Sequence, residues 1–226
     1  MPPSAGLALF LAYPEPGTVK ARLAATLGPE RAARFYWESA LLVMAKALRL
    51  RNTEVFVFVT PAEKQAETAA LVMARFGRFE GRFLAQKGNT PGERINHALE
   101  RLKVMGFARQ LVLGTDSPTI PLEFLQRAVD ELAAVDCAIG PTWAGGYYLI
   151  GLRNPDVRVF RDINWGSGME LQRTFDNLSS LKLTCRMLPR WQDVDGPDDL
   201  AFLEGQVRHA DYRRLRDILE EAPPRT

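Results

Sequence analysis

Short apolar runs alternate along this chain with longer amphipathic segments. Apolar runs bounded by turn residues are typical of strands buried on both faces of a sheet. Segments with an apolar residue every three or four positions are typical of helices that cover such a sheet. The apolar runs predict strands over residues 6–12, 54–60, 82–85, 111–113, 137–141, 145–151 and 181–188.

Between these runs, the pattern predicts helices. They are expected over a segment starting at residue 18 and over residues 28–50, 61–76, 95–105, 122–134 and 169–178. Gly196-Pro197 is expected to open a further helix near the C-terminus, followed by a frayed tail over 222–226. Strands that alternate with helices predict an α/β fold, a layered sandwich around a mostly parallel sheet. Since no linker or repeat divides the sequence, we expect a single domain over 1–226.

The composition is that of an ordinary globular protein. Of the 226 residues, 46% are hydrophobic and 25% are charged, and the formal net charge is +2. No run of Lys and Arg is long enough to indicate a nucleic-acid or membrane surface. The apolar run over 7–11 is too short to span a membrane and has no basic segment before it, so we expect a cytoplasmic protein.

Cysteine and histidine are too scarce for several common kinds of site. Cys137 and Cys185 each lie in an apolar run and are expected to be small buried hydrophobic residues, not a disulfide framework or a zinc site. His97 and His209 both lie in charged, helical surroundings. A histidine-based catalytic triad or a histidine-rich metal site is therefore not expected.

The stretch over 111–118, LVLGTDSP, is the strongest candidate for chemistry. It is a buried strand that ends abruptly in turn residues. Ligands of open α/β sheets bind beyond the carboxyl ends of the strands, so Asp116 is a candidate metal or substrate ligand. The alternative is structural: Asp116 or Ser117 would cap the following helix, with Pro118 opening the turn.

A second candidate lies after the first strand. The loop over 13–17 leads into a predicted helix with Lys20 and Arg22 in its first turn. Cations there oppose the helix dipole, whereas backbone N–H groups at a helix start attract phosphate. An anionic ligand would explain both cations; the alternative is that they are solvated surface charges. The loop lacks the spacing of a Walker-type phosphate loop.

Three further segments contain turn or polar residues at strand ends. The polar loop over 86–94 is a candidate ligand contact. The pair Gly145-Gly146 indicates a bulge or a close backbone approach to a ligand, and a tight turn is the alternative. Acids cluster over 193–199. The aromatic residues Trp143, Tyr147, Tyr148 and Trp165 would form either an exposed patch for a partner protein or, as we expect, packing in the cleft or core.

Taken together, these motifs resemble a known family over nearly the whole chain. The family is the glycosyltransferase A-like family DUF2064, similar to nucleotide-diphospho-sugar transferases and more distantly to molybdenum-cofactor and phospholactate guanylyltransferases. The segments that carry the resemblance are PEPGTVKARL at 14–23, the loop over 86–94, LGTDSP at 113–118, GPTWAGGYYLIGL at 140–152 and DVDGPDDL at 193–200.

The resemblance implies a fold and a set of site residues. The fold would be a three-layer α/β/α sandwich with a mixed sheet, of the nucleotide-diphospho-sugar transferase (GT-A) type. Asp116 and Asp195, with Asp193, would hold Mg²⁺ or Mn²⁺, and Asp116 and Lys20 would be catalytic. Nucleotide and substrate would be held by Pro16, Gly17, Lys20, Arg22, Gly145, Gly146 and Tyr147.

The implied function is metal-dependent glycosyl transfer from a nucleotide-sugar donor to an acceptor. A guanylyltransferase-type nucleotidyltransferase is the alternative. Two residues depart from the family pattern, because Ala12 stands where a lysine is frequent and Ala144 where an aspartate is usual. These departures motivate a third hypothesis, a catalytically weakened nucleotide-binding protein. Neither nucleic acid nor a membrane is an expected partner.

Overall fold

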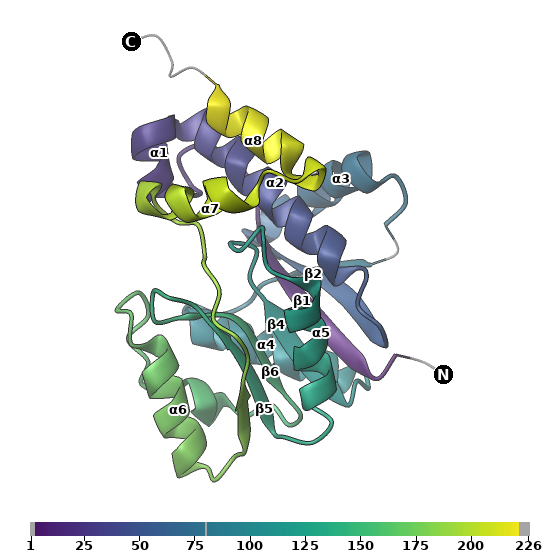
Figure 1. Ribbon diagram of the computed structural model, residues 1–226. Helices are drawn as coiled ribbons and strands as arrows, with labels where there is room; N and C mark the ends of the chain where they lie inside the picture. The colour runs from purple at the N-terminus through teal and green to yellow at the C-terminus, as the bar shows by residue number, and fades with distance from the viewer. Residues whose placement is uncertain (1–2, 80, 222–226) are drawn as a thin grey trace.

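The computed structural model describes residues 3–79 and 81–221. Its centre is a seven-stranded sheet with the order β3-β2-β1-β4-β6-β5-β7 (Figure 1). β6 runs antiparallel to its neighbours β4 and β5, and the other neighbouring strands pair in parallel. The predicted mostly parallel, mixed sheet is thereby confirmed. The strands are β1 (Ala5–Ala12), β2 (Thr53–Thr60), β3 (Arg82–Ala85), β4 (Arg109–Leu113), β5 (Cys137–Pro141), β6 (Tyr147–Leu152) and β7 (Cys185–Met187).

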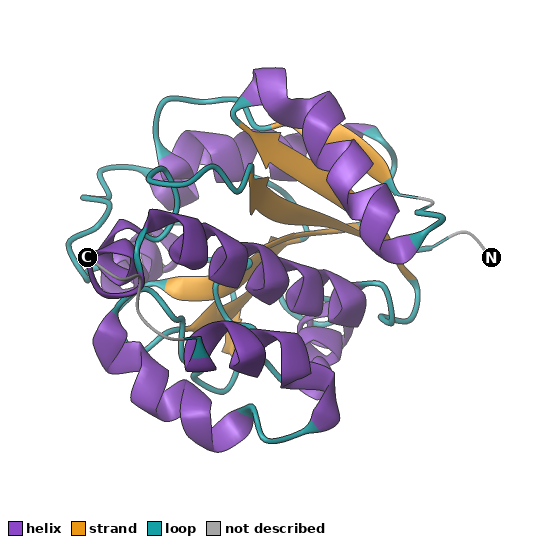
Figure 2. Cartoon of the chain, turned by 90° about the horizontal axis from the view of Figure 1, so that it is seen from above, coloured by secondary structure: helices purple, strands orange, loops and turns teal. Residues whose placement is uncertain are grey.

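Helices pack on both faces of this sheet, which gives the predicted three layers (Figure 2). One apolar cluster joins the sheet to α2, α3 and α5, and a second joins it to α4 and α6. A third cluster packs α1, α7 and α8 against α2. The helices are α1 (Ala21–Leu27), α2 (Pro29–Ala47), α3 (Gln65–Phe76), α4 (Pro91–Val104), α5 (Leu122–Glu131), α6 (Glu170–Ser180), α7 (Leu200–Gln206) and α8 (Arg213–Glu220).

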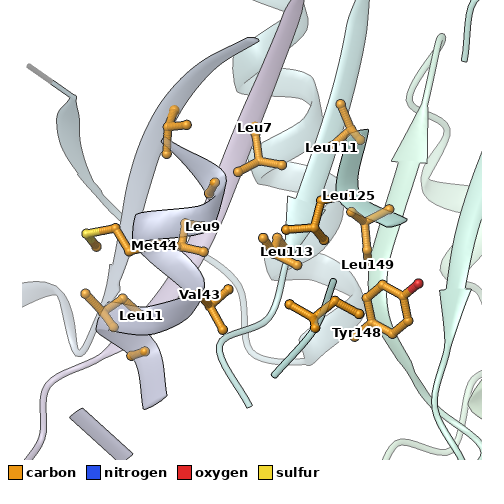
Figure 3. Packing of buried hydrophobic residues seen from close by; sticks show 14 of the residues in the cluster. Leu7, Leu9, Leu11, Val43, Met44, Leu111, Leu113, Leu125, Tyr148 and Leu149 are labelled. Atoms are coloured by element: carbon orange, nitrogen blue, oxygen red, sulfur yellow. The ribbon is translucent and has the colours of Figure 1, made fainter. Parts of the chain in front are cut away.

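Strand β1 lies between β2 and β4 and is apolar on both faces. Successive side chains of a strand point to opposite faces, so Leu7, Leu9 and Leu11 share one face. They pack toward Val43 and Met44 of α2 (Figure 3). This continuous burial explains why β1 has an unbroken apolar sequence instead of an alternating one.

Two predicted helix starts are wrong, and both lie beside the cleft described below. α1 begins at Ala21, and Lys20 precedes it in the left-handed conformation with φ 51°, so Lys20 is not in a helical turn. α4 begins at Pro91, so the last residues of the predicted loop over 86–94 form its first turn. Thr90 caps α4 by accepting a hydrogen bond from the Glu93 N–H (3.2 Å), a signal that the sequence analysis missed.

Boundaries in the second half of the chain also differ from prediction. β7 covers three residues of the predicted 181–188 run, and β6 begins after the glycine pair, which lies in the preceding turn. The predicted C-terminal helix is divided into α7 and α8, which are separated by the short helical turn Ala210–Tyr212. The expected frayed tail over 222–226 lies outside the described residues.

The two cysteines face each other across neighbouring strands. Cys137 on β5 is buried, Cys185 on β7 is half-buried, and the two are register partners in the parallel pair. Both are free thiols; Cys137 is buried as predicted, whereas the prediction that Cys185 is also buried is only partly met. In the described part of the chain, no helix combines the length and the apolar character that crossing a bilayer requires.

The packing of β1 generates a stability prediction. Leu9 is fully buried, so we expect Leu9→Ala to lower the free energy of unfolding by about 3 kcal/mol, because it leaves a cavity between β1 and α2. Leu48→Ala, at a side chain that is 42% exposed, is the matched control and should cost less than about 1 kcal/mol. Urea denaturation of both variants measures the difference, and equal losses would contradict the packing described here.

Candidate functional site

A cleft of about 830 Å³ opens at the carboxyl ends of β1 and β4 and at the start of β6. Phe10 and Ala12 of β1, Asp116 after β4, and Tyr147 of β6 contribute to its lining. This is the sheet edge where the sequence places a ligand, because parallel strands deliver their following loops to the same edge. The cleft therefore coincides with the loops that carry the candidate chemistry.

Two acids from distant parts of the chain meet at one cation in this cleft. The Lys20 Nζ lies 2.5 Å from Asp116 Oδ1 and 2.6 Å from Asp195 Oδ1. The Lys20 side chain is 5% exposed, whereas those of Asp116 and Asp195 are 41% and 49% exposed. The buried ammonium thus holds two carboxylates that remain open to the cleft.

The charge of Lys20 is maintained by these neighbours. Burial acts to lower the pKa of Lys20, but the charges of Asp116 and Asp195 and their hydrogen bonds outweigh it and raise this pKa well above its usual value. Lys20 is therefore a permanent cation at neutral pH. Lys20 is predicted to bind phosphate, and in the structure its ammonium contacts the carboxylates of Asp116 and Asp195.

Arg22 is the other predicted phosphate ligand, and it also lines the cleft. Its guanidinium lies against the backbone at Gly196: a Cβ atom at position 196 would lie 2.7 Å from Arg22 Nη2. The glycine therefore makes room for the arginine beside Asp195. This contact joins the first turn of α1 to the acidic segment after β7.

Asp116 does not cap the following helix, which excludes the structural alternative for this residue. α5 begins at Leu122, and its start receives no side-chain cap hydrogen bond. The Ser117 hydroxyl instead donates to Asp193 Oδ1 (2.5 Å), and the Val194 N–H donates to the Asp116 carbonyl (2.9 Å). These bonds attach the loop after β4 directly to the acidic segment.

Asp193 is the third predicted acid; it also lines the cleft, and its Oδ1 accepts the hydrogen bond from Ser117. Burial and the nearby charge of Asp116 raise the pKa of Asp193 to about 7, although the hydrogen bond from Ser117 opposes this shift. A carboxyl group with this pKa changes its protonation state near neutral pH. Asp193 is thus chemically distinct from the two acids on Lys20.

Asp199 fixes the backbone that carries Asp195. Its Oδ2 accepts hydrogen bonds from the N–H groups of Asp195 (2.9 Å) and Gly196 (2.8 Å), and its Oδ1 accepts from Gln192 Nε2 (2.6 Å). Capping by an acid in the first helical turn is a common role for aspartate. The four acids of the cluster therefore differ in role: Asp199 is structural, Asp193 and Asp195 line the cleft, and Asp198 is exposed.

Tyr36 is a cleft residue that the sequence analysis missed. Its hydroxyl accepts from the Ala12 N–H (2.7 Å) and lies 3.3 Å from Thr115 Oγ1, whose hydroxyl donates to the Phe10 carbonyl (3.1 Å). Burial raises the pKa of Tyr36 to about 12, so the phenol stays neutral. This chain of hydrogen bonds joins the ends of β1 and β4 next to Asp116.

The glycine pair has an intramolecular explanation. Gly145 has φ 86°, and a Cβ atom there would lie 1.8 Å from the Gly168 carbonyl oxygen. Its own carbonyl accepts from the Leu171 N–H (2.9 Å). Gly145 is therefore required by the contact between two turns. Among the predicted nucleotide-binding residues, Gly146 and Tyr147 line the cleft with Lys20 and Arg22, whereas Pro16, Gly17 and Gly145 do not.

The four aromatic residues do not form one exposed patch. Tyr147 and Trp165 line the cleft as an edge-to-face pair with ring centroids 6.3 Å apart. Tyr148 is buried and donates its hydroxyl to the Pro189 carbonyl (3.0 Å). Trp143 is 61% exposed, with the Arg190 guanidinium 5.3 Å from its ring centroid.

The oxygen ligands for a hard metal ion are few. Within residues 3–79 and 81–221, no group of three or more His, Cys, Asp or Glu side chains is arranged to hold a metal. The candidate set is the pair Asp116 and Asp195. Mg²⁺ in proteins is frequently held by one or two carboxylates together with substrate phosphates and water, so this pair is chemically sufficient for it.

Comparison with known proteins gives a family match and a set of similar structures. Residues 43–167 match the family described as "Uncharacterized protein conserved in bacteria (DUF2064)". A protein from Desulfovibrio desulfuricans G20, provisionally described as a nucleotide-diphospho-sugar transferase, is 32% identical, with a TM-score of 0.85 over 95% of this chain and 94% of that one. No curated protein matches the sequence significantly.

More distant structures share the fold. CMP:2-keto-3-deoxy-manno-octonic acid synthetase complexed with CTP is 13% identical, with a TM-score of 0.54 over 89% of this chain and 97% of that one. The inositol-1-phosphate CTP transferase from T. maritima is 11% identical, with a TM-score of 0.56 over 98% of each chain. At these identities the likeness concerns the fold alone.

The raised pKa of Asp193 predicts a pH-dependent stability difference. The folded protein holds this proton up to about pH 7, whereas an unfolded aspartate loses it near pH 4, so ionisation of Asp193 destabilises the fold as pH rises from about 4 to 7. We expect Asp193→Asn to gain more than about 1 kcal/mol relative to the wild type over that range.

Denaturant titrations in EDTA, at half-unit pH steps, measure this difference. Asp198→Asn, at an exposed acid in the same segment, is the control and should give a curve parallel to that of the wild type. Parallel curves for Asp193→Asn as well would show that the Asp193 carboxyl has an ordinary pKa.

Proposed function

This chain belongs to the bacterial family DUF2064, and we propose that it is a transferase whose cleft binds a nucleotide-activated donor together with Mg²⁺ or Mn²⁺. The reaction that we propose is glycosyl transfer from a nucleotide sugar. The fold supports this proposal, because the similar structures include a provisionally described nucleotide-diphospho-sugar transferase and nucleotidyltransferases, one of them with CTP.

One observation carries the proposal: Asp116 and Asp195 converge on a single nitrogen at the carboxyl edge of the sheet. Two carboxylates held together and half exposed leave oxygen atoms for a divalent cation. When bound there, the cation would neutralise charge on the donor phosphates and on the leaving nucleotide. We propose Asp116 and Asp195 as its protein ligands.

The remaining charges suit a phosphate-bearing donor. Lys20 and Arg22 are the two cations among the described residues that line the cleft, and both lie beside Asp195. Positive charge at this position would attract the donor diphosphate, which is the role that the sequence analysis assigns to both residues. The Lys20 ammonium is already paired with the acids, so we propose that it also keeps them apart and oriented when no metal is bound.

Nucleotidyl transfer is the alternative reaction in the same cleft. It would consume a nucleoside triphosphate and release pyrophosphate, whereas glycosyl transfer would release a nucleoside diphosphate. The replacement of the expected acid by Ala144 removes a carboxylate from the cleft, which is the observation that keeps a weakened, binding-only protein as a further candidate. Product analysis separates the three.

Nucleotide binding should depend on the Asp116 carboxylate. We expect Asp116→Asn to weaken the affinity for the preferred nucleotide or nucleotide sugar by more than about tenfold in the presence of Mg²⁺, because a carboxylate ligand becomes a neutral amide. Isothermal titration calorimetry against a panel of nucleoside diphosphates, triphosphates and nucleotide sugars provides the measurement. Asp217→Asn, at an exposed acid on α8, is the matched control and should bind like the wild type.

The result that contradicts the proposal is the absence of binding to every compound of the panel. Binding that is equal in the wild type and in Asp116→Asn, or equal with Mg²⁺ and with EDTA, would remove the proposed metal site while leaving a nucleotide site. Release of a diphosphate supports glycosyl transfer, release of pyrophosphate supports the alternative, and binding without either product supports the weakened protein.

A further inference from the structure

The half of the cleft that faces β5 and β6 differs in composition from the half that contains Lys20 and Arg22. We call it the acceptor half and define it as Thr142, Ala144, Gly146, Tyr147, Trp165 and Glu170, all of which line the cleft. We infer that this half binds a neutral alcohol with a ring, such as a sugar, and does not bind a phosphorylated acceptor. This inference rests on the proposed function, because it presumes that the donor occupies the other half.

The first argument is the distribution of charge. Among the described residues, the cleft lining has two cations, Lys20 and Arg22, and four carboxylates. Both cations belong to the segment after β1, beside the Asp116 and Asp195 pair, and neither belongs to the acceptor half. The charged residue of the acceptor half is an acid, Glu170. A phosphate placed there would meet no opposite charge from the described protein.

The backbone N–H groups around Glu170 do not provide an alternative site for a phosphate. Its carboxylate accepts hydrogen bonds from the backbone N–H groups of Gly166 and Ser167, the latter at 2.9 Å. These two donors lie in the turn that precedes α6, and they are taken up by a carboxylate of the protein itself. They are therefore not free to bind an external anion.

The second argument is the aromatic character of the wall. Tyr147 and Trp165 both line the cleft and form an edge-to-face pair there, with ring centroids 6.3 Å apart. Aromatic rings supply broad apolar contact with few polar requirements, and ligand sites typically combine such walls with a small number of hydrogen-bonding groups. The apolar face of a sugar or a similar ring suits this wall.

A neutral alcohol also fits the proposed chemistry. Its hydroxyl oxygen would form a bond to the anomeric carbon of the donor sugar, while the bond from that carbon to the phosphate oxygen breaks. The electron pair of the broken bond leaves on the nucleoside diphosphate, and the hydroxyl proton passes to water. No co-reactant beyond donor, acceptor and water is required.

Paired acceptors test the inference directly. The probes are methyl glucoside, phenyl glucoside and inositol, each compared with its monophosphate, and binding to the wild-type protein with Mg²⁺ and a nucleoside diphosphate is measured by saturation-transfer NMR and competition. We expect each neutral ring to bind at least about tenfold more tightly than its phosphate. Tighter binding of the phosphates, or no binding of any probe, would overturn the inference.

Two variants make the test specific to the acceptor half. Ala144→Lys adds a cation there and should strengthen binding of the monophosphates several-fold. Trp165→Ala, at a ring that lines the cleft, should weaken binding of the neutral rings by about tenfold, while Met73→Ala, at a 47% exposed side chain on α3, is the control. A Trp165→Ala variant that binds neutral rings like the wild type would exclude Trp165 from the acceptor wall.

Failure of this inference can be told apart from failure of the proposed function. If calorimetry detects no nucleotide binding, the donor proposal is wrong whatever the acceptor probes do. If nucleotide binds with Mg²⁺ but the phosphorylated probes are preferred, the donor proposal stands and the acceptor inference alone is overturned.

Discussion

The contact of one buried ammonium with two carboxylates is the interaction on which the candidate site depends. Lys20 follows β1, Asp116 follows β4 and Asp195 follows β7, so one cation joins three separate segments at the same sheet edge. Without a positive charge between them, two acids at this separation would repel each other and the loops would move apart. The charge on Lys20 is secure, because its carboxylate neighbours raise its pKa more strongly than burial lowers it.

The surrounding hydrogen bonds make this arrangement specific. Tyr36 and Thr115 join the ends of β1 and β4, Ser117 is bonded to Asp193, and Asp199 holds the backbone of Asp195. These bonds join the loops of the site to one another and, through Tyr36 of α2, to the apolar core. The cleft thus has a rigid donor side with all its cations and an aromatic side with none, and this asymmetry motivates the separate proposals for donor and acceptor.

The sequence predicts the sheet well because its signal is local. Apolar runs such as 54–60 can be recognised without knowledge of their neighbours, and a parallel sheet places Asp116 at the functional edge by topology alone. The left-handed conformation of Lys20 has no local signal, and its bond to Asp195 joins residues far apart in the chain. Tyr36 occurs in an apolar helical stripe, where a core role is the natural interpretation. Gly145 looks like a ligand contact, but only the position of Gly168 reveals that the turns themselves require it.

The central claim is that Asp116 and Asp195 together bind a divalent cation, and that the donor phosphates supply further ligands to it. The most direct measurement is anomalous diffraction from crystals grown with Mn²⁺ and a nucleoside diphosphate. We expect one manganese peak within about 2.5 Å of a carboxylate oxygen of each of the two aspartates, with phosphate oxygens as further ligands. A peak bound to neither aspartate, or a bound nucleotide without any peak beside these carboxylates, would contradict the claim.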